Sequence, residues 1–372
     1  MTIDPEALGR RIAEARTRSG LSQAELSRRV DLDRSALAKI ELGQRRVSAL
    51  ELARLAGEVG TRIEWLLREG PPSIVSRRNS REPGMPNPPV DDMAERIARE
   101  VEFAAEHDER FRLRHIATHG MPTSGQEAEA LAETARRLLG FEPSDPCTHL
   151  STAAARIGLL VFSLDLGADS ADAATVLLPE GGIALINGAL PVGRRRLALA
   201  HELGHYLVAD EYTVDWKVAE AQDEHSRERL FDRFARALLL PAAAVRADWE
   251  RFAADPDGGM RTAAVRIASA YRVDMSTLAR RLGELGVVRS ADADRIRSIR
   301  TTRADIVELD LVVADELAPP ELPREYERSV LRLFRAESVS AERALDLLLD
   351  TWTEDALPAL PRRAEDELWQ FL

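Results

Sequence analysis

The run His201-Glu202-Leu203-Gly204-His205 constrains this chain more than any other feature. Histidines four positions apart share one face of an α-helix, so both imidazoles can reach one metal ion. The glutamate between them can act on a metal-bound water. Catalytic zinc typically takes three protein ligands, so a third must come from elsewhere in the chain. The alternative interpretation is a buried pair of histidines with a purely structural role.

Candidates for the third ligand lie on one predicted helix at about 219–240. Proline ends this helix at position 241. Its apolar positions predict a buried face, and they are Leu230, Phe231, Phe234, Ala235, Leu238 and Leu239. The candidate carboxylates are Glu220, Glu224 and Glu228. Glu224 and Glu228 share the packed face one turn apart, and the spacing does not separate them.

Length and composition exclude several classes of protein. A chain of 372 residues predicts two to three domains, and 45% hydrophobic residues can form real cores. No apolar run approaches the roughly 18 residues of a membrane span, and the N-terminus lacks the apolar core of a signal peptide. Cys147 is the single cysteine, which excludes an internal disulfide and a zinc ribbon. We therefore expect a cytoplasmic protein without membrane partners.

The first 70 residues differ from the rest in charge and pattern. They carry a net charge of +2, which leaves −14 for the remainder of a chain whose total is −12. Ser22 and Glu25 form a predicted capping box at the start of one short helix. A turn then leads to a second short helix at 34–41, which Gly43 ends. Two helices joined in this way predict a helix-turn-helix, whose second helix enters the major groove of DNA.

This segment resembles the lambda-repressor-like Xre family over about residues 8–67. The resemblance rests on Leu-Ser-Gln-Ala-Glu-Leu at 21–26, on the stretch 35–46 and on the helix that begins at Ser48. It implies double-stranded DNA as a partner. The implied contacts are Gln23 to a phosphate, Arg34, Ser35 and Lys39 in the groove, and Gln44, Arg45 and Arg46 on the backbone. A bundle that binds protein or only dimerises is the alternative.

Proline-rich sequence separates this module from the rest. We predict domains at 1–70 and 91–288, a linker at 71–90 and a helical C-terminal region at 289–372. Short apolar runs at 159–162, 176–178 and 183–187 predict strands, with a hairpin turn at 179–182. The strand at 183–187 is either an edge for docking of an extended peptide or an ordinary core strand. Helices at about 323–336 and 340–351 would mediate a homodimer or cover the second domain.

Residues about 125–286 resemble the ImmA/IrrE family of metallopeptidases. The match covers 184–187, then 195–206 with the two histidines, and then 228–241. The resemblance implies a zincin-like domain with a small sheet, Zn²⁺ held by His201, His205 and Glu228, and Glu202 as general base. The family usually has Ala-Asn where this chain has Phe231-Asp232, and Asp232 can still accept a hydrogen bond from a ligand imidazole.

The expected fold class is therefore α+β and mostly helical. The leading hypothesis is an Xre-type regulator fused to a zinc metallopeptidase that cuts a regulatory protein, such as a helix-turn-helix repressor. Peptide hydrolysis also needs a donor for the oxyanion, and the candidates are Tyr206, Tyr212 and His225. Two rival hypotheses keep the fold without proteolysis, namely a metal or ligand sensor and an antitoxin-like partner-binding module. An intact Glu202 favours the enzyme, because metal binding alone needs no base.

Overall fold

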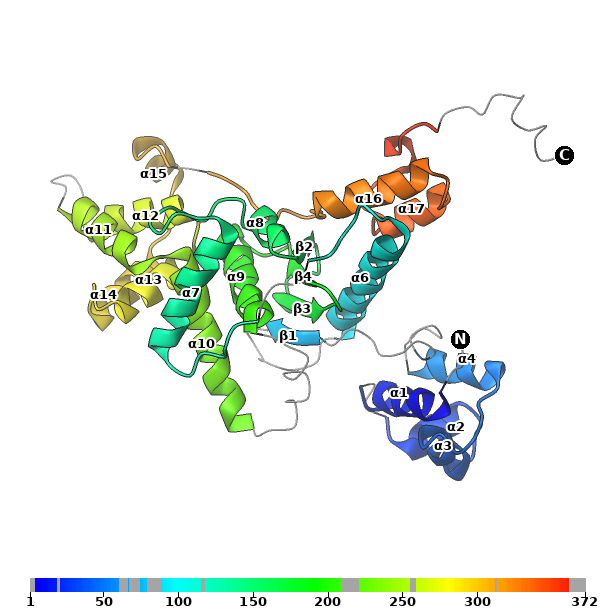
Figure 1. Cartoon of the computed structure of the whole chain (residues 1–372). Coiled ribbons are helices and arrows are strands. Elements are labelled where there is room, and N and C mark those ends of the chain that lie inside the picture. The colour runs from blue at the N-terminus through cyan, green and yellow to red at the C-terminus, as the bar shows by residue number, and fades with distance from the viewer. Residues whose placement is uncertain are drawn as a thin grey trace. The chain divides into compact units, whose positions relative to one another are not determined.

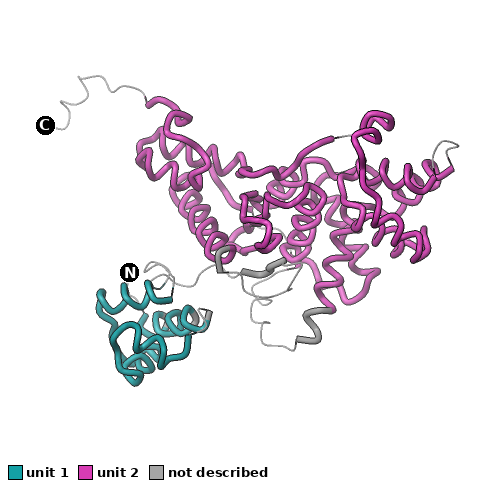
Figure 2. Tube along the Cα trace, turned by 180° about the vertical axis from the view of Figure 1, so that it is seen from behind, with its two compact units in different colours: residues 1–73 teal, residues 74–372 magenta. Residues whose placement is uncertain are grey.

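The computed structural model describes residues 4–18, 21–59, 66, 74–78, 88–114, 118–208, 221–254, 259–311 and 313–360. The chain divides into two compact units, residues 1–73 and 74–372 (Figure 2). The described residues form one hydrophobic core in unit 1 and two in unit 2. Among the described residues, no helix combines the length and the apolar character that a membrane span requires.

Unit 1 is an all-helical bundle. Its helices are α1 (Pro5–Arg18), α2 (Gln23–Arg29), α3 (Arg34–Glu41) and α4 (Ala49–Glu58). The predicted capping box is present: the Ser22 hydroxyl accepts a hydrogen bond from the backbone N–H of Glu25, whose side chain accepts one from Ser22 N–H. Gly43 follows α3 with φ +69°, a conformation that glycine adopts without strain. The predicted helix-turn-helix is confirmed.

Unit 2 combines a small sheet with many helices. Before the helix that carries the two histidines it contains β1 (Ile74–Arg78), α6 (Pro88–His107), α7 (Gly125–Leu139), α8 (Leu150–Arg156), β2 (Leu159–Leu164), β3 (Ala173–Leu177) and β4 (Gly182–Asn187). Then follow α9 (Val192–Val208), α10 (Ala221–Leu239), α11 (Ala242–Ala253), α12 (Met260–Tyr271), α13 (Met275–Glu284), α14 (Ser290–Ser298), α15 (Arg303–Glu308), α16 (Arg324–Arg335), α17 (Ala341–Leu347) and a 3₁₀ turn (Glu354–Ala356). The α+β, mostly helical class is confirmed.

The sheet has the strand order β1-β3-β4-β2. β3 and β4 form the predicted antiparallel hairpin, β2 runs parallel to β4, and β1 runs antiparallel to β3. Of the two alternatives for 183–187, the edge strand is therefore wrong and the core strand is right, because β4 is paired on both sides. The segment expected to be a linker at 71–90 also differs from the structure, since it contains β1 and the first residues of α6.

Both faces of the sheet are covered by helices (Figure 1). Val161 and Ile186 belong to the core that includes α9 and α10. Phe162 and Leu185, one residue along each strand, belong to the core with α6 and α16, because successive strand side chains alternate between faces. Tyr326 of α16 is fully buried in that second core. The C-terminal helices thus cover the sheet of their own unit.

Candidate functional site

Two helices meet at the candidate metal centre. α9 carries both histidines and is buried along nearly its whole length, and α10 packs across it. Gly204 lies where they cross. A Cβ at this position would come within 2.9 Å of the rings of both Phe231 and Phe234, so only glycine allows this approach without a shift. The glycine inside the histidine motif therefore sets how closely α10 can bring its side chains to the imidazoles.

His201, His205 and Glu228 converge at this crossing. The two Nε2 atoms lie 3.1 Å apart, and Glu228 Oε2 lies 3.1 Å from His201 Nε2. Glu228 Oε1 lies 3.4 Å from His205 Nε2. Tetrahedral zinc with bonds of 2.0–2.2 Å keeps neighbouring ligand atoms about 3.3–3.6 Å apart, so only small shifts separate these donors from that geometry. The chemistry and the separations of these donors fit zinc.

Asp232 orients the first histidine. Its Oδ1 lies 3.1 Å from His201 Nδ1, one turn along α10 from Glu228. A carboxylate at this position can accept a hydrogen bond from Nδ1–H, and Nε2 is then the ring nitrogen that can bind a metal ion. Phe231 packs on the other imidazole, with its ring centroid 3.9 Å from that of His205. The departure from the usual Ala-Asn pair thus places an aromatic ring against one histidine and a carboxylate against the other.

Glu228 is held in its ionised form. Burial alone would raise the pKa of its carboxyl group, but hydrogen bonds and charge from His201 and His205 outweigh this effect and hold the pKa well below its usual range. Its side chain is 30% exposed, whereas that of His201 is 2% exposed. The cluster therefore has a closed histidine side and a more open carboxylate side.

Glu202 is an exception among the buried polar groups. It is 0% exposed, and neither carboxylate oxygen has a hydrogen-bond partner among the described residues. Thr175 of β3 is also 0% exposed, and its Oγ1 has no hydrogen-bond partner among the described residues either. Sequence reasoning did not single out Thr175, because a threonine in an apolar strand is unremarkable there. Buried polar groups are usually paired, so both call for an explanation.

The oxyanion candidates fare differently. The Tyr206 hydroxyl donates a hydrogen bond of 2.9 Å to the carbonyl oxygen of Ile157. Burial also raises the pKa of this phenol. Tyr206 therefore anchors α9 to the C-terminal end of α8, and its only proton is engaged, which corrects the expectation. Tyr212, like the alternative ligand Glu220, lies outside the described residues. His225 and Glu224 lie on α10, where the structure describes the backbone alone at these positions.

The predicted DNA-contacting residues lie on and after α3 of unit 1. Arg34, Ser35 and Lys39 of α3 are exposed, and so are Gln44 and Arg46 in the following loop. The two others have partners within the unit. Arg45 forms an ion pair of 2.7 Å with Glu51, and the Gln23 amide donates a hydrogen bond of 2.6 Å to Glu41. The exposed side chains are accessible to DNA. Arg45 and Gln23 could contact DNA only by giving up their contacts with Glu51 and Glu41 or by making both contacts at once.

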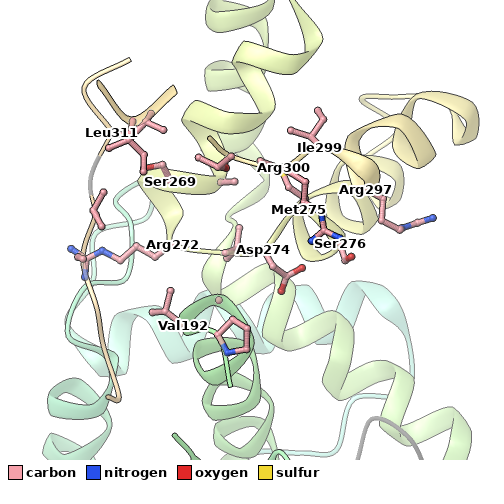
Figure 3. Close-up of a pocket in the computed structure, with 18 residues that line it drawn as sticks. Val192, Ser269, Arg272, Asp274, Met275, Ser276, Arg297, Ile299, Arg300 and Leu311 are labelled. Atoms are coloured by element: carbon pink, nitrogen blue, oxygen red, sulfur yellow. The ribbon is translucent and has the colours of Figure 1, made fainter. Parts of the chain in front are cut away.

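A cavity of about 440 Å³ lies at the N-terminal end of α9. Figure 3 shows Val192 on one side of it and Leu311 and Ile299 on the other. Its lining includes none of the three clustered residues. Two of its arginines are already paired, Arg272 with Glu316 and Arg297 with Asp294. This cavity is separate from the histidine centre.

Comparison with known proteins finds a different family model in each of the two units. Residues 12–66 match the helix-turn-helix family model, and residues 154–283 match the model of the IrrE N-terminal-like domain. The chain therefore carries an Xre-like helix-turn-helix domain at its N-terminus and an IrrE/ImmA-like peptidase-family domain in its C-terminal region. In coarse terms it is a helix-turn-helix regulator with a peptidase-like domain.

Part of the chain is similar to several solved chains, among them one crystal structure. It is the crystal structure of the restriction-modification controller protein C.AhdI from Aeromonas hydrophila. The two are 38% identical, and the similarity covers 17% of this chain and 96% of that chain, with a TM-score of 0.17. No curated protein matches the chain.

Proposed function

We propose that this chain is a DNA-binding transcriptional regulator whose peptidase-like domain is a zinc-dependent metalloendopeptidase. The observation that carries the proposal is the pairing of a convergent His₂Glu cluster with an adjacent buried carboxylate, Glu202, that has no partner among the described residues. A site that only bound metal would need the cluster and not the second carboxylate. A structural carboxylate at this depth would ordinarily be hydrogen-bonded.

Each residue then has a distinct part in hydrolysis. His201, His205 and Glu228 would hold zinc, which when bound polarises the scissile carbonyl and makes water a better nucleophile. Glu202 takes a proton from the attacking water and delivers it to the leaving amine. Asp232 keeps His201 in the tautomer whose Nε2 lone pair faces the ion. None of the three oxyanion candidates has a side chain that the structure shows free for this role, so we assign none.

The proposed substrate is a regulatory protein, such as a repressor of the same helix-turn-helix class. Binding of unit 1 to DNA would hold the peptidase-like domain near other DNA-bound proteins. A short flexible connection can give effective concentrations of about 1 mM. The proposed activity then belongs where the DNA is, in the cytoplasm. Hydrolysis of one or a few bonds in such a partner is enough to change gene expression.

This activity is tested by incubating the zinc-loaded protein with casein and with candidate regulators encoded nearby. We expect cleavage of one regulator at one or a few bonds, with little digestion of casein. The Glu202→Gln variant is the control, because it keeps the cluster and lacks the base. Efficient general digestion of casein would contradict a dedicated regulatory peptidase, and equal cleavage by Glu202→Gln would point to a contaminating protease.

The proposed DNA contacts are tested on the isolated residues 1–73, which form a compact unit with their own core. Arg34→Ala/Lys39→Ala removes two exposed cations from α3. We expect weaker duplex binding and a salt dependence reduced by about one unit of slope for each lost phosphate contact. Arg54→Ala removes an exposed cation from α4 and should change binding little. Absence of binding by the wild-type unit at low salt would exclude DNA recognition.

A further inference from the structure

β1 is an unusual member of the sheet. It immediately follows unit 1 in the chain, and it lies outside the segment 154–283 that matches the peptidase-family domain. The three remaining strands come from within that segment. Without β1, the strand order would leave β3 at the edge of the sheet. The fourth strand thus lies outside the matched segment, at the start of unit 2.

This edge of the sheet adjoins the candidate active site. α9 packs against β1, β3 and β4. Glu202 and Tyr206 are four residues apart, so they share a face of α9. That face points toward the sheet, since the Tyr206 ring contacts the sheet at Gly182, the first residue of β4. Glu202 therefore lies on the face of α9 that meets the sheet, next to the face that carries the histidines.

Two buried polar groups without partners occur on this side. Along β3, Ala173 belongs to the core with α9, whereas Ala174 and Val176 belong to the opposite core. Alternation therefore points Thr175 toward α9. Thr175 is the residue of β3 that pairs with Ser76 of β1. The Thr175 hydroxyl and the Glu202 carboxylate are both enclosed without partners among the described residues. Such groups are expected where a site built for a polar ligand and water has been covered.

We propose that the outer edge of β3 is the peptide-binding edge of this centre and that residues 74–78 occupy it as an internal, displaceable strand. The proposal rests on the proposed function for the identity of the centre. The partner that fits the edge is an extended peptide segment, which would bind through main-chain hydrogen bonds as an added antiparallel strand. The connection between the two units then controls access to the site, because it must leave before a second peptide can enter.

The ladder is suited to exchange. β1 has only five residues, pairs with one strand, and has an irregular register between Ile74 and Ser76. It is nevertheless favoured over a free peptide, because a tethered strand acts at an effective concentration of about 1 mM. Displacement therefore requires either a peptide of high affinity or a change in the connection, such as engagement of unit 1.

The test is peptide binding by the full chain in a Glu202→Gln background, where no bond is cut. The probe is a fluorescein-labelled peptide with the sequence of residues 72–80, followed by anisotropy. Ser76→Pro/Arg77→Pro removes at least one ladder N–H, because these alternate along an edge strand. We expect this variant to bind the probe at least tenfold more tightly than the parent. The matched control Arg81→Pro/Glu82→Pro, in the same connection beyond β1, should bind like the parent.

Hydrogen exchange gives a second readout. Amides of β3 should lose protection in Ser76→Pro/Arg77→Pro and regain it when the probe is added. If this variant does not fold, Arg77→Cys/Ala174→Cys replaces it, since these residues are paired across β1 and β3. Its disulfide should abolish the residual probe binding of the parent, and dithiothreitol should restore it.

Two results would overturn the proposal. One is a folded proline variant that binds the probe no better than the parent, and the other is equal binding by the oxidised and reduced cysteine variant. The proposed function can fail separately. A chain that exchanges the strand as described but cuts no protein would retain the peptide-binding edge without proteolysis. A chain that cleaves a regulator equally well with β1 disrupted would retain proteolysis without the occupied edge.

Discussion

Two buried charged side chains in unit 2 have opposite surroundings. Arg281 of α13 is 0% exposed, and all three of its guanidinium nitrogens donate hydrogen bonds, one to the Leu240 carbonyl oxygen and two to Glu129. Glu202 of α9 is equally buried, but its oxygens have no partner among the described residues. The two side chains are equally buried, but only Arg281 has hydrogen-bond partners among the described residues.

The difference separates a structural polar group from a functional one. A paired buried charge ties elements together, here the end of α10 with α7 and α13. An unpaired buried carboxylate costs free energy of folding and contributes nothing to packing in return. A carboxylate that does not stabilise the fold is expected to have a functional role, and the histidine cluster next to Glu202 indicates a role at the proposed metal centre. Each variant below should affect either stability or the proposed activity, and seldom both.

The largest effect is expected for Glu202→Gln. Loss of the general base should lower the cleavage rate by about 10²- to 10⁴-fold. Zinc content should remain that of wild type, because Glu202 is not among the clustered donors. The free energy of unfolding should stay equal or rise, since the variant replaces a buried carboxyl group that has no partner among the described residues. Paired rate and denaturant measurements check this, and a clear loss of stability would mean that Glu202 has a structural role.

Arg281→Met should lower the stability of the fold and leave the metal cluster unchanged. Breaking a buried ion pair by removing one partner costs about 3–5 kcal/mol of unfolding free energy. Zinc content per folded chain should be unchanged. Arg295→Met is the control, since Arg295 is 72% exposed and its pair with Asp292 should contribute less than about 1 kcal/mol. Urea denaturation measures both, and equal losses would remove the distinction between the two regions.

At acid pH the difference in free energy of unfolding between wild type and Arg281→Met should become smaller. Burial raises the pKa of Glu129, but the hydrogen bonds and charges of Arg281 and Arg233 outweigh it and lower the pKa. A carboxyl group with a lowered pKa in the folded state stabilises the fold above its unfolded pKa and loses that contribution as the pH falls. The stability difference should therefore shrink from pH 7 toward pH 3. A constant difference would show that the lost stability comes from packing.

A smaller effect is expected for Asp232→Ala. Loss of a carboxylate that orients a metal ligand typically weakens metal affinity by 10- to 100-fold. Asp232→Asn keeps an oxygen that can accept the His201 Nδ1 proton, so we expect a smaller loss. Competition with a chromogenic chelator measures both affinities. Unchanged zinc affinity in Asp232→Ala would show that the contact does not support the cluster.

The smallest effects compare two buried hydroxyls. The Ser163 hydroxyl donates a hydrogen bond of 2.6 Å to the carbonyl oxygen of Leu317, whereas Thr175 Oγ1 has no partner in the described part of the chain. Ser163→Ala should cost about 1 kcal/mol, and Thr175→Val should leave stability unchanged or raise it by up to about 1 kcal/mol. Thermal unfolding can resolve the difference in sign. A loss of similar size in both would indicate that Thr175 has a partner after all.

The sequence predicts features whose partners lie within a few residues. The capping box joins Ser22 and Glu25, and the two histidines lie one turn apart, so neither depends on the rest of the fold. The α10 helix and the hairpin of β3 and β4 are equally local. These parts of the fold and site follow from the residues themselves.

Features that depend on packing between segments far apart in the chain cannot be predicted from the local sequence. Glu228 and Glu224 lie one turn apart on α10, and the approach of that helix to Gly204 decides which meets the histidines. β4 is buried on both faces, so its sequence shows no alternation that would tell a central strand from an edge. β1 lies among prolines that predict a linker, and its partner in the sheet is β3, a segment about 100 residues away in the sequence.

Metal analysis of protein purified without added metal tests the central claim most directly. Wild type, Glu202→Gln and Glu224→Ala should each contain about one zinc per chain, while His201→Ala and Glu228→Ala should contain almost none. Circular dichroism must show that every variant is folded. A folded wild-type protein that takes up no zinc would contradict the account. So would loss of zinc from Glu224→Ala together with its retention in Glu228→Ala.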